Sequence, residues 1–402
     1  MKLMNVVVVG AGPTGLLTAL GLARAGIEVT VLESEPAVVR SPRALVYHWA
    51  VLEGLDRLGV LDDMMRTGFT NPELCIIVLK SGEKIRLNIN SLAGEVTHPY
   101  QVHLGQDKLA DIALQHLARF PRARVLWRAR VTGLSDDGEA VTVRAETAGA
   151  RLELRAGWVV GADGGHSTVR QALGLRMDGM TWPERFVATN IRYDFARHGY
   201  APANVVIDAP YGAIVAQIDH AGLWRCTYCE DASLPEDSIL ERMPDYFNAA
   251  LPGSKHYELI EYSPYRMHQR CAERMRVGRV LLAGDAAHIT NPTGGLGLTC
   301  GLYDAYVLYE ALAAVMRGAL GEEALDRYAE QRRRAFLEHA SPEASNFKHM
   351  VYHAKDLAEL ETQLAAFRAA ASDLTLQRRI FLTAKKLETP SLVPGRAPTI
   401  PR

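Results

Sequence analysis

The chain carries, at residues 3–33, the stretch LMNVVVVGAGPTGLLTALGLARAGIEVTVLE. Residues 3–9 form an apolar run rich in β-branched side chains, a glycine turn follows at once, and residues 16–25 then place apolar side chains at helical spacing. A second apolar run at 27–32 ends in an acidic residue. The stretch therefore predicts a strand, a tight turn, a helix and a second strand, which together form a βαβ unit.

The glycine turn has the spacing Gly10-x-Gly12-x-x-Gly15. Each glycine has a physical reason in a nucleotide-binding turn, because Gly10 permits the tight turn, Gly12 lets a pyrophosphate approach the backbone, and Gly15 lets the helix pack closely on the strand. Pro13 and Thr14 occupy the start of the helix, where free N–H groups and the positive end of the helix dipole face bound phosphates.

Glu33 ends the second strand, 18 residues after Gly15. At that place a carboxylate can accept hydrogen bonds from a ribose. A glycine turn without a ligand is the alternative explanation, but it accounts neither for the flanking strand and helix nor for the terminal Glu33. The sequence therefore predicts a dinucleotide-binding fold of the Rossmann type.

The length and composition of the chain restrict its class. With 402 residues, of which 48% are hydrophobic and 23% charged, we expect a globular protein of about two domains. A formal net charge of −1 argues against nucleic-acid and membrane-surface partners, because basic patches hold both. No apolar run reaches the ~20 residues that span a bilayer. We expect no signal peptide, because the chain enters the first predicted strand directly.

The cysteines and one basic run have structural explanations. Five cysteines, an odd number in a long chain, do not indicate a disulfide framework, so we expect a reducing, cytoplasmic setting. Cys226 and Cys229 form a CxxC pair in a predicted strand, where positions three apart point to opposite faces, and no second ligand pair follows, so no metal site is expected. The three arginines at 332–334 lie in a helical pattern and are interpreted as a solvated face.

The rest of the chain predicts an α/β fold, with a Rossmann-type domain, an inserted, mostly antiparallel β-sheet domain and C-terminal helices. A helical pattern runs over 45–58, and residues 74–79 and 84–89 predict a hairpin inserted into the first domain. The tail from Thr389 contains four prolines and is expected to be poorly ordered. The expected parts are a nucleotide-binding domain at 1–176 and 277–340, a substrate-binding domain at 177–276, and a C-terminal helical segment and tail at 341–402.

Two more glycine turns follow predicted buried strands, one after residues 158–162 and one after residues 280–283. A single turn of this kind is ambiguous, but three of them at the ends of three strands indicate one nucleotide site. The two motifs are Asp163-Gly164-x-x-Ser167-x-x-Arg170 and Gly284-Asp285-Ala286-Ala287-His288, which continues to Pro292, Gly295, Gly297 and Asp304-Ala305.

Together the three motifs resemble those of the aromatic hydroxylases of the flavoprotein monooxygenase family, the group whose best-known member hydroxylates para-hydroxybenzoate. The resemblance covers most of residues 3–340. It implies FAD as the cofactor and NADH or NADPH as the electron donor. It also implies that the first motif holds the FAD pyrophosphate, that Asp285 bonds the ribityl chain, and that the segment from Pro292 to Leu298 lies along the isoalloxazine.

The resemblance assigns further residues to the cofactor. Arg43 and Gln106 match positions that contact the flavin nucleotide, and the Asp163 motif is associated with both FAD and the nicotinamide. For Asp163 and Arg170 a structural ion pair is the alternative. Thr299 stands where many relatives carry Asn. The implied cofactor-binding residues are Gly10, Gly12, Pro13, Thr14, Gly15, Glu33, Arg43, Gln106, Asp163, Arg170, Asp285, Pro292, Gly295, Gly297 and Leu298.

The activity that the resemblance implies is hydroxylation of a phenol-like or hydroxy-N-heteroaromatic ring, with NAD(P)H and O₂, through a flavin C4a-hydroperoxide. A deprotonated ring hydroxyl pushes electron density to the ortho carbon, and the protein supplies position, dryness and a base. The alternatives are an FAD-dependent reductase of the geranylgeranyl-reductase kind, a halogenase, which the absence of a WxWxIP signature disfavours, and a flavin-dependent sensor. The expected partners are a small aromatic substrate and O₂, with a monomer or a homodimer as the assembly.

His48 is the candidate catalytic base. It lies five residues after Arg43, at the start of a helix that in the family borders the substrate side of the flavin, and its reference pKa of about 6.5 suits proton transfer at neutral pH. A surface or satisfied core histidine is the alternative. Tyr47 is a candidate relay, Pro292 is a candidate catalytic position beside the flavin, and His288 is interpreted as structural. The candidate substrate ligands in the second domain are Arg192, Tyr193 and Tyr211.

Overall fold

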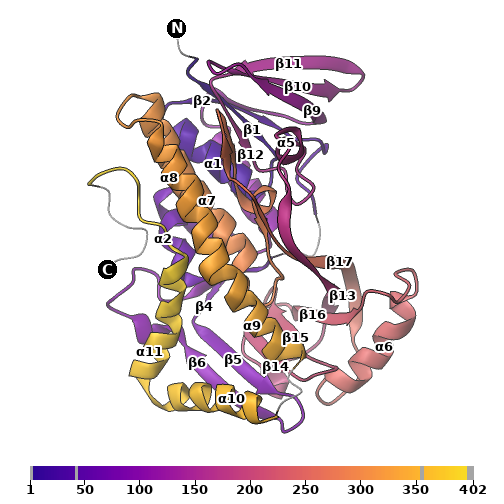
Figure 1. Cartoon of the computed structure of the whole chain (residues 1–402). Helices are drawn as coiled ribbons and strands as arrows, with labels where there is room; N and C mark the ends of the chain where they lie inside the picture. The colour runs from indigo at the N-terminus through magenta and orange to yellow at the C-terminus, as the bar shows by residue number, and fades with distance from the viewer. Residues whose placement is uncertain (1–2, 41–43, 354–356, 396–402) are drawn as a thin grey trace.

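The structure is a computed structural model that describes residues 3–40, 44–353 and 357–395. A nucleotide-binding part built on a mostly parallel sheet is stacked on a second part built on a larger mixed sheet, and the C-terminal helices run along both parts (Figure 1). The predicted α/β fold class is confirmed.

The sheet of the nucleotide-binding part is parallel except at its edge strand β18. Its central strand β1 reads NVVVV and is buried on both faces, as expected for a parallel strand covered by helices. In spatial order the strands are β18 (Arg276–Val277), β19 (Val280–Leu282), β12 (Trp158–Gly161), β1 (Asn5–Val9), β2 (Glu28–Leu32) and β8 (Ala123–Leu126).

Helix α1 (Pro13–Arg24) packs between α4 (Gln106–Leu117) and α7 (Leu296–Met316). Gly21 of α1 faces the ring of Tyr309 of α7, and a Cβ at Gly21 would collide with that ring. The glycine therefore lets the two helices approach closely. As a result, the first glycine turn, which leads into α1, and the third, which leads into α7, lie at neighbouring helices.

The second sheet contains the hairpin that the sequence analysis grouped with the first domain. The hairpin extends this sheet because β5 pairs with β14 in parallel, with Val205 opposite Ile76. In spatial order the strands are β20 (His288–Ile289), β17 (Glu258–Ala272), β13 (Met177–Arg192), β16 (Leu223–Asp231), β15 (Ala213–Gln217), β14 (Ala203–Ile207), β5 (Glu73–Val78) and β6 (Glu83–Asn88).

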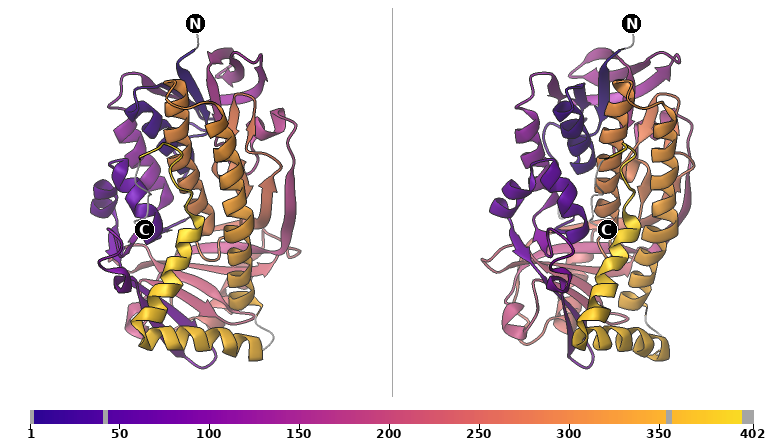
Figure 2. Two further views of the ribbon diagram at one scale, coloured as in Figure 1. Left: turned by 60° about the vertical axis from the view of Figure 1, so that its left-hand side comes forward. Right: turned by 90° about the vertical axis from the view of Figure 1, so that its left-hand side faces the viewer.

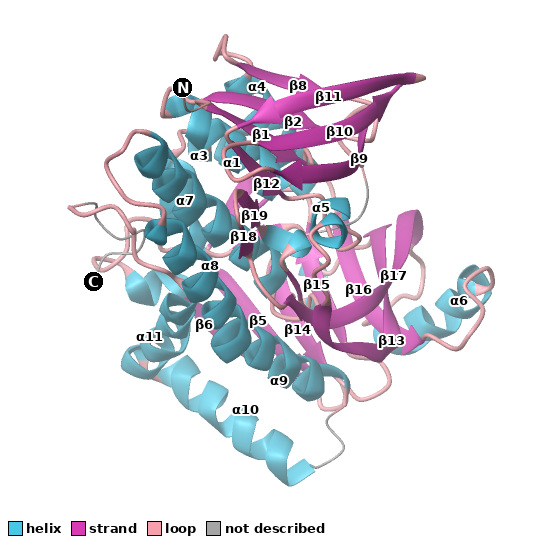
Figure 3. Cartoon of the chain, turned by 45° about the horizontal axis from the view of Figure 1, so that its top comes forward, coloured by secondary structure: helices cyan, strands magenta, loops and turns pink. Residues whose placement is uncertain are grey.

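Helices cover both faces of the second sheet. They are α6 (Ile239–Ala250) on one face, and α9 (Ser341–Tyr352) and α10 (Leu357–Ser372) on the other (Figures 1 and 3). Because side chains alternate along a strand, Cys226 packs in the α6 core while Cys229 packs in the α9 core. The expectation that the CxxC pair points to opposite faces is therefore confirmed, and both cysteines are free thiols.

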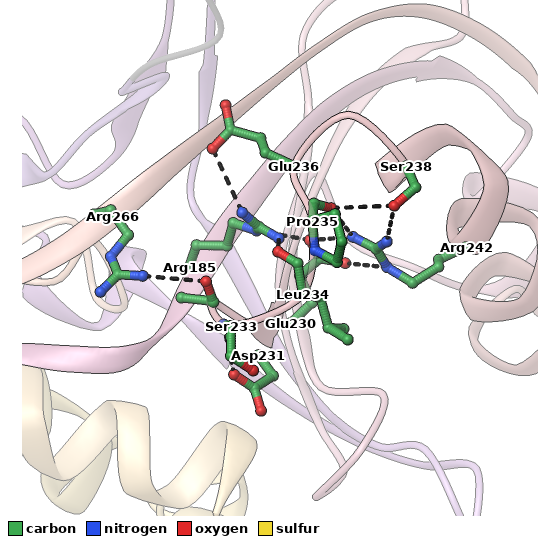
Figure 4. A network of polar contacts seen from close by, with 11 residues as sticks. Arg185, Glu230, Asp231, Ser233, Leu234, Pro235, Glu236, Ser238, Arg242 and Arg266 are labelled. Carbon is green, nitrogen blue, oxygen red and sulfur yellow. Dashed lines mark hydrogen bonds and ion pairs between the residues drawn. The ribbon is translucent and has the colours of Figure 1, made fainter.

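A buried ion-pair network joins β13 to α6 (Figure 4). The Arg185 guanidinium donates to Glu230 Oε1 at 2.7 Å and to the carbonyl of Leu234, and Arg242 of α6 donates to Glu230 Oε2 at 3.1 Å. The two arginines thereby share one carboxylate, which fixes the loop between β16 and α6.

Shorter elements connect these layers. The helix predicted over 45–58 begins only at Trp49, because Val46 and Tyr47 pair with the strand β7. No helix in the described ranges is long and apolar enough to cross a membrane. The shorter elements are β3 (Val46–Tyr47), α2 (Trp49–Arg57), α3 (Leu61–Thr67), β4 (Phe69–Asn71), β7 (Gln101–His103), β9 (Ala129–Asp136), β10 (Val141–Thr147), β11 (Ala150–Ala156), α5 (Thr168–Ala172), α8 (Glu323–Ala335) and α11 (Leu374–Leu382).

After α10 and α11, residues 383–395 return to the nucleotide-binding part (Figure 2), and the rest of the predicted tail, residues 396–402, lies outside the described ranges. Thr389 is buried and its Oγ1 accepts a hydrogen bond from Arg332 of α8 at 3.1 Å. The expectation of a poorly ordered tail is therefore wrong for the first residues of the tail, because their polar groups hydrogen-bond to a buried arginine.

Arg332 is fully buried, so the interpretation of the arginine run as a solvated face is wrong for its first member. Its Nε donates to Asp304 Oδ1 at 2.8 Å, and His288 Nε2 lies 2.7 Å from Asp304 Oδ2. Burial alone would raise the pKa of Asp304, but its interactions with His288 and Arg332 lower that pKa to about 2. Successive helix positions point in different directions, so Arg334 is exposed and pairs with Glu338.

Arg332→Met should lower the free energy of unfolding by about 3 to 5 kcal/mol, because it leaves the buried Asp304 carboxylate without its guanidinium. The matched control Arg334→Met, on the same helix, removes only an exposed ion pair and should change stability by less than about 0.5 kcal/mol. Urea unfolding measures both. Equal stabilities of the two variants would contradict this account of Arg332.

Candidate active site

The first glycine turn forms a cradle at the start of α1. Gly10 has φ +102°, and a Cβ there would collide with the carbonyl of Ala162, which follows β12. A Cβ at Gly15 would collide with the carbonyl oxygen of Gly10. At Gly12, in contrast, a Cβ would meet no atom within 4 Å. Two glycines are therefore required by packing, whereas Gly12 leaves open space beside the helix N-terminus.

Glu33 stands beside this cradle at the end of β2. Its Oε2 accepts a hydrogen bond from the backbone N–H of Ala11 at 2.7 Å, and its Oε1 accepts one from the N–H of Glu35 at 2.9 Å. The partly exposed carboxylate is thus oriented by the glycine turn itself. This geometry fits the predicted role of accepting hydrogen bonds from a ribose.

The three predicted glycine turns contact one another. Thr14 of α1 packs against the third turn, since a Cβ at Gly284 would lie 2.8 Å from Thr14 Oγ1. Arg170 of the second turn donates to the carbonyl of Ala286 in the third at 3.0 Å. Because the second turn already touches Gly10 through Ala162, motifs from three distant parts of the sequence form one continuous surface.

Asp163 and Arg170 both serve to build the second turn. Asp163 accepts hydrogen bonds from Ser167 Oγ at 2.5 Å and from the N–H of Val169 at 3.1 Å. Burial raises the pKa of the Asp163 carboxyl, and these hydrogen bonds oppose that shift. Arg170 donates to the carbonyls of Gly165 and Ala286, so its contacts are to backbone rather than to Asp163.

Asp285 lies exposed on the third turn. A buried hydrogen bond holds the turn in place, because the N–H of Gly284 donates to Asp304 Oδ2 at 2.8 Å. His288 bonds the same carboxylate and stacks on Phe336 with ring centroids 4.6 Å apart. His288 is therefore buried in a structural position, as the sequence analysis interpreted it.

The segment from Pro292 to Leu298 leads into α7. Gly295 has φ +70°, which favours glycine, and it forms the N-cap of the helix. Support comes from β17, where Gln269 Oε1 accepts hydrogen bonds from the backbone N–H of Asn291 at 3.1 Å and from its side-chain amide at 3.0 Å. Pro292, Gly294, Gly295, Gly297 and Leu298 remain partly exposed, while Thr293 and Leu296 are buried.

His48 meets this segment from the other side. Its Nε2 lies 2.9 Å from the carbonyl oxygen of Gly294, so Nε2 carries the proton and donates it, and Nδ1 carries the lone pair. Nδ1 forms no hydrogen bond within the described residues. Burial lowers the pKa of His48 from its ordinary value, and the hydrogen bond to Gly294 opposes the shift. The side chain is therefore a neutral base at neutral pH.

The side chains of Tyr47 and His48 point in different directions. Tyr47 is buried in the core of the nucleotide-binding part, because neighbouring residues of an extended chain point to opposite sides. Burial raises the pKa of its phenol, which disfavours proton transfer. Gln106 lies partly exposed at the first turn of α4, and Arg43 lies outside the described residues.

The three candidate substrate ligands of the second domain have their contacts elsewhere in that domain. Tyr193 is buried in the α6 core and donates to the carbonyl of Ser254 at 3.0 Å. Tyr211 contacts Tyr246 of α6 through its carbonyl oxygen, and Arg192 is exposed beside Glu258. Strand alternation turns Tyr193 toward the face of the sheet opposite α9, so its predicted contact with the substrate has no support in this geometry.

Two contributors to the site were missed from sequence. Gln269 is polar and buried within a long strand, where an amide side chain needs partners from another segment. Phe347 lies on α9, and a Cβ at Gly294 would lie 3.7 Å from its ring. Neither residue belongs to a recognisable motif, and the burial of Gln269 is visible only in the structure, so no sequence signal pointed to either of them.

The residues present fit FAD. The open space at Gly12 and the helix N-terminus suit a pyrophosphate, the exposed Asp285 suits a ribityl hydroxyl, and the partly exposed glycines after Pro292 leave room for a flat ring. The surface formed by the three turns therefore provides one site for each section of the cofactor.

Gly12→Val should fold but bind no FAD. The backbone at Gly12 is extended, with φ −74°, and its Cβ direction is open, so valine fills only the pyrophosphate space. The matched control Gly15→Val places its Cβ against the Gly10 carbonyl and should lose stability instead. Visible flavin absorbance and thermal melting of the purified variants separate the two effects. A yellow, fully loaded Gly12→Val protein would contradict the assignment.

Comparison with known proteins identifies the family. A family model described as FAD binding domain matches residues 3–340. A para-nitrophenol 4-monooxygenase of Pseudomonas sp. strain WBC-3 is 44% identical over 388 residues, which are 95% of this chain and 96% of that protein. The 6-hydroxy-3-succinoylpyridine 3-monooxygenase HspB of Pseudomonas putida strain S16 is 42% identical over 386 residues, 96% of this chain and 98% of its own length.

The crystal structure of p-nitrophenol 4-monooxygenase PnpA from Pseudomonas putida DLL-E4 superimposes with a TM-score of 0.91 at 43% identity, covering 96% of this chain and 99% of that one. The agreement extends over the cradle, the second sheet and the C-terminal helices together. With the three nucleotide-binding turns assembled into one surface, the chain belongs to the FAD-dependent aromatic hydroxylases of the flavoprotein monooxygenase family.

Proposed function

We propose that this enzyme hydroxylates a single aromatic ring with a free hydroxyl, either a phenol or a hydroxypyridine, at the ring carbon opposite that hydroxyl. The contact that carries the proposal is the one between His48 and Gly294, because it joins a neutral base to the segment expected to line the flavin ring. NAD(P)H is the electron donor and O₂ the oxidant in this class of enzyme.

The names of the two relatives support the position on the ring. In para-nitrophenol 4-monooxygenase, position 4 carries the nitro group and lies opposite the hydroxyl. In 6-hydroxy-3-succinoylpyridine 3-monooxygenase, position 3 carries the succinoyl group and lies opposite the 6-hydroxyl. A ring oxyanion donates electron density to the para carbon as well as to the ortho carbon. Where the para carbon carries a nitro group, the C–N bond breaks after the new C–O bond forms, so the nitro group leaves as nitrite and the ring becomes a quinone.

We assign His48 the role of the base. With its proton on Nε2 held by the Gly294 carbonyl, Nδ1 accepts the proton of the ring hydroxyl. The pKa of His48, lowered by burial, keeps it neutral at pH 7, and it loses this ability only as the pH falls below that pKa. Tyr47 has no part in this step, and Pro292 contributes through its place in the segment beside the flavin.

When bound, FAD accepts hydride from NAD(P)H and activates O₂ toward the ring. The residues of this chain hold the cofactor, shield the ring from water and remove the proton from its hydroxyl. The described part of the chain contains one dinucleotide fold, so we infer that the nicotinamide approaches from solvent. The reductase alternative is not favoured by the monooxygenase relatives.

A panel of phenols and hydroxypyridines with hydrogen or a nitro group opposite the hydroxyl should accelerate NAD(P)H oxidation. The ¹⁸O from ¹⁸O₂ should enter the product at that carbon, from which the hydrogen leaves as a proton and the nitro group as nitrite. Mass spectrometry with a ring-position assignment by NMR provides the measurement. Label at an ortho carbon would contradict the proposed position. Normal product formation without O₂ would contradict oxygen insertion altogether.

His48→Ala should retain FAD and its reduction by NAD(P)H but lose hydroxylation by about 10²- to 10⁴-fold, since the base is gone. Reduced O₂ should then appear as peroxide, and raising the pH should restore part of the activity by ionising the phenol in solution. The matched control is His256→Ala, at an exposed position outside the site. If His48→Ala couples NAD(P)H use to product at neutral pH as well as the control, His48 is not the base.

A further inference from the structure

The helix α9 lies beyond the family domain but reaches the proposed site. The family model ends at residue 340, and α9 begins at Ser341. Its residue Phe347 approaches Gly294, since a Cβ at Gly294 would lie 3.7 Å from Cδ2 and 3.8 Å from Cγ of the phenyl ring. The C-terminal segment, which has no assigned role, therefore places an aromatic ring facing Gly294 of the segment expected beside the flavin.

Phe347 and His48 meet at the same residue. His48 bonds the carbonyl of Gly294, while the ring of Phe347 faces the position where a side chain of Gly294 would start. Both side chains are partly exposed, whereas the adjacent Thr293 and Leu296 are buried. A substrate that binds beside Gly294 with its hydroxyl at His48 would therefore lie next to the glycine that Phe347 faces.

Two polar anchors hold α9 in this place. At its start, Ser341 accepts hydrogen bonds from Gln269 Nε2 at 2.8 Å on Oγ and at 3.0 Å on its carbonyl, and Gln269 is the residue that supports Asn291. Near its end, the buried Lys348 ammonium lies 2.9 Å from Glu184 Oε2 of β13.

The buried ammonium of Lys348 has several interaction partners. Lys348 Nζ also lies 2.8 Å from His353 Nε2 and 4.1 Å from the centroid of the Trp182 ring. A buried ammonium with a carboxylate, an imidazole and an aromatic face around it permits little movement of the backbone that carries it. Phe347, its neighbour in sequence, is held in position by this anchor.

We propose that Phe347 of α9 forms part of the substrate-binding surface and determines which aromatic rings the enzyme accepts. The inference rests on the proposed function, since it places the ring substrate at His48 and Gly294. An aromatic side chain favours stacked or edge-to-face contact with a flat ring, and it limits the size of substituents on the side facing α9. The helix outside the family domain thus supplies specificity to a site built by that domain.

The test measures binding separately from turnover. Phe347→Ala should weaken the binding of p-nitrophenol by about 3- to 10-fold, because the contact between two aromatic rings is lost. It should also improve the relative binding of a two-ring phenol such as 2-naphthol. Perturbation of the flavin absorbance during titration of the FAD-loaded protein gives both dissociation constants. Phe347→Trp should have the opposite effect on the two ligands, and Phe347→Leu serves if the alanine variant does not fold.

Phe367→Ala is the matched control. Phe367 is a partly buried aromatic residue of α10 in the same apolar core, so it tests loss of a phenyl ring without contact to Gly294. A folded, FAD-loaded Phe347 variant that binds both phenols as the control does would overturn the inference and leave the proposed function intact. Altered binding without ¹⁸O incorporation by the wild type would support the inference and overturn the hydroxylation. A wild type that binds no phenol would overturn both.

Discussion

The active site depends on the hydrogen bonds that the buried carboxylate of Asp304 accepts. The carboxylate accepts hydrogen bonds from Arg332 of α8, from His288 and from the N–H of Gly284, and all of these groups are buried. A charge so deeply buried is tolerated only when it is paired and fully hydrogen-bonded. The carboxylate thereby fixes the third glycine turn, and with it the exposed Asp285, to two long helices.

The three glycine turns around Asp304 are held together mainly by close approach of their backbones rather than by contacts between large side chains. Glycines at the three turns allow backbones to touch, while Thr14 and Arg170 connect one turn to the next. The side chains that carry the proposed chemistry come from outside the turns. His48 is the N-cap of α2 and bonds the carbonyl of Gly294, while Phe347 of α9 faces the position where a side chain of Gly294 would start. The same nucleotide-binding turns can therefore be combined with substrate-binding side chains that differ from one protein to another.

The nucleotide-binding part could be predicted because its signals are local. The run of residues 3–33 contains strand, turn and helix in sequence, and the structure has them in that order. Arg332 was misjudged because three successive arginines share one helical pattern, and only tertiary packing decides which of them faces inward. The hairpin itself was predicted, but its pairing with β14 of the second sheet was not, because that pairing depends on a segment far along the chain. The approach of the Phe347 ring to Gly294 was missed for the same reason.

We place the substrate between His48 and Phe347, beside Gly294. A crystal structure of the FAD-loaded protein with a bound phenol tests this placement most directly. We expect the phenol oxygen at about 2.6 to 3.2 Å from Nδ1 of His48, with the ring in contact with Phe347. A phenol bound instead on the α6 side, beside Tyr193 or Tyr211, would show that this placement of the substrate is wrong.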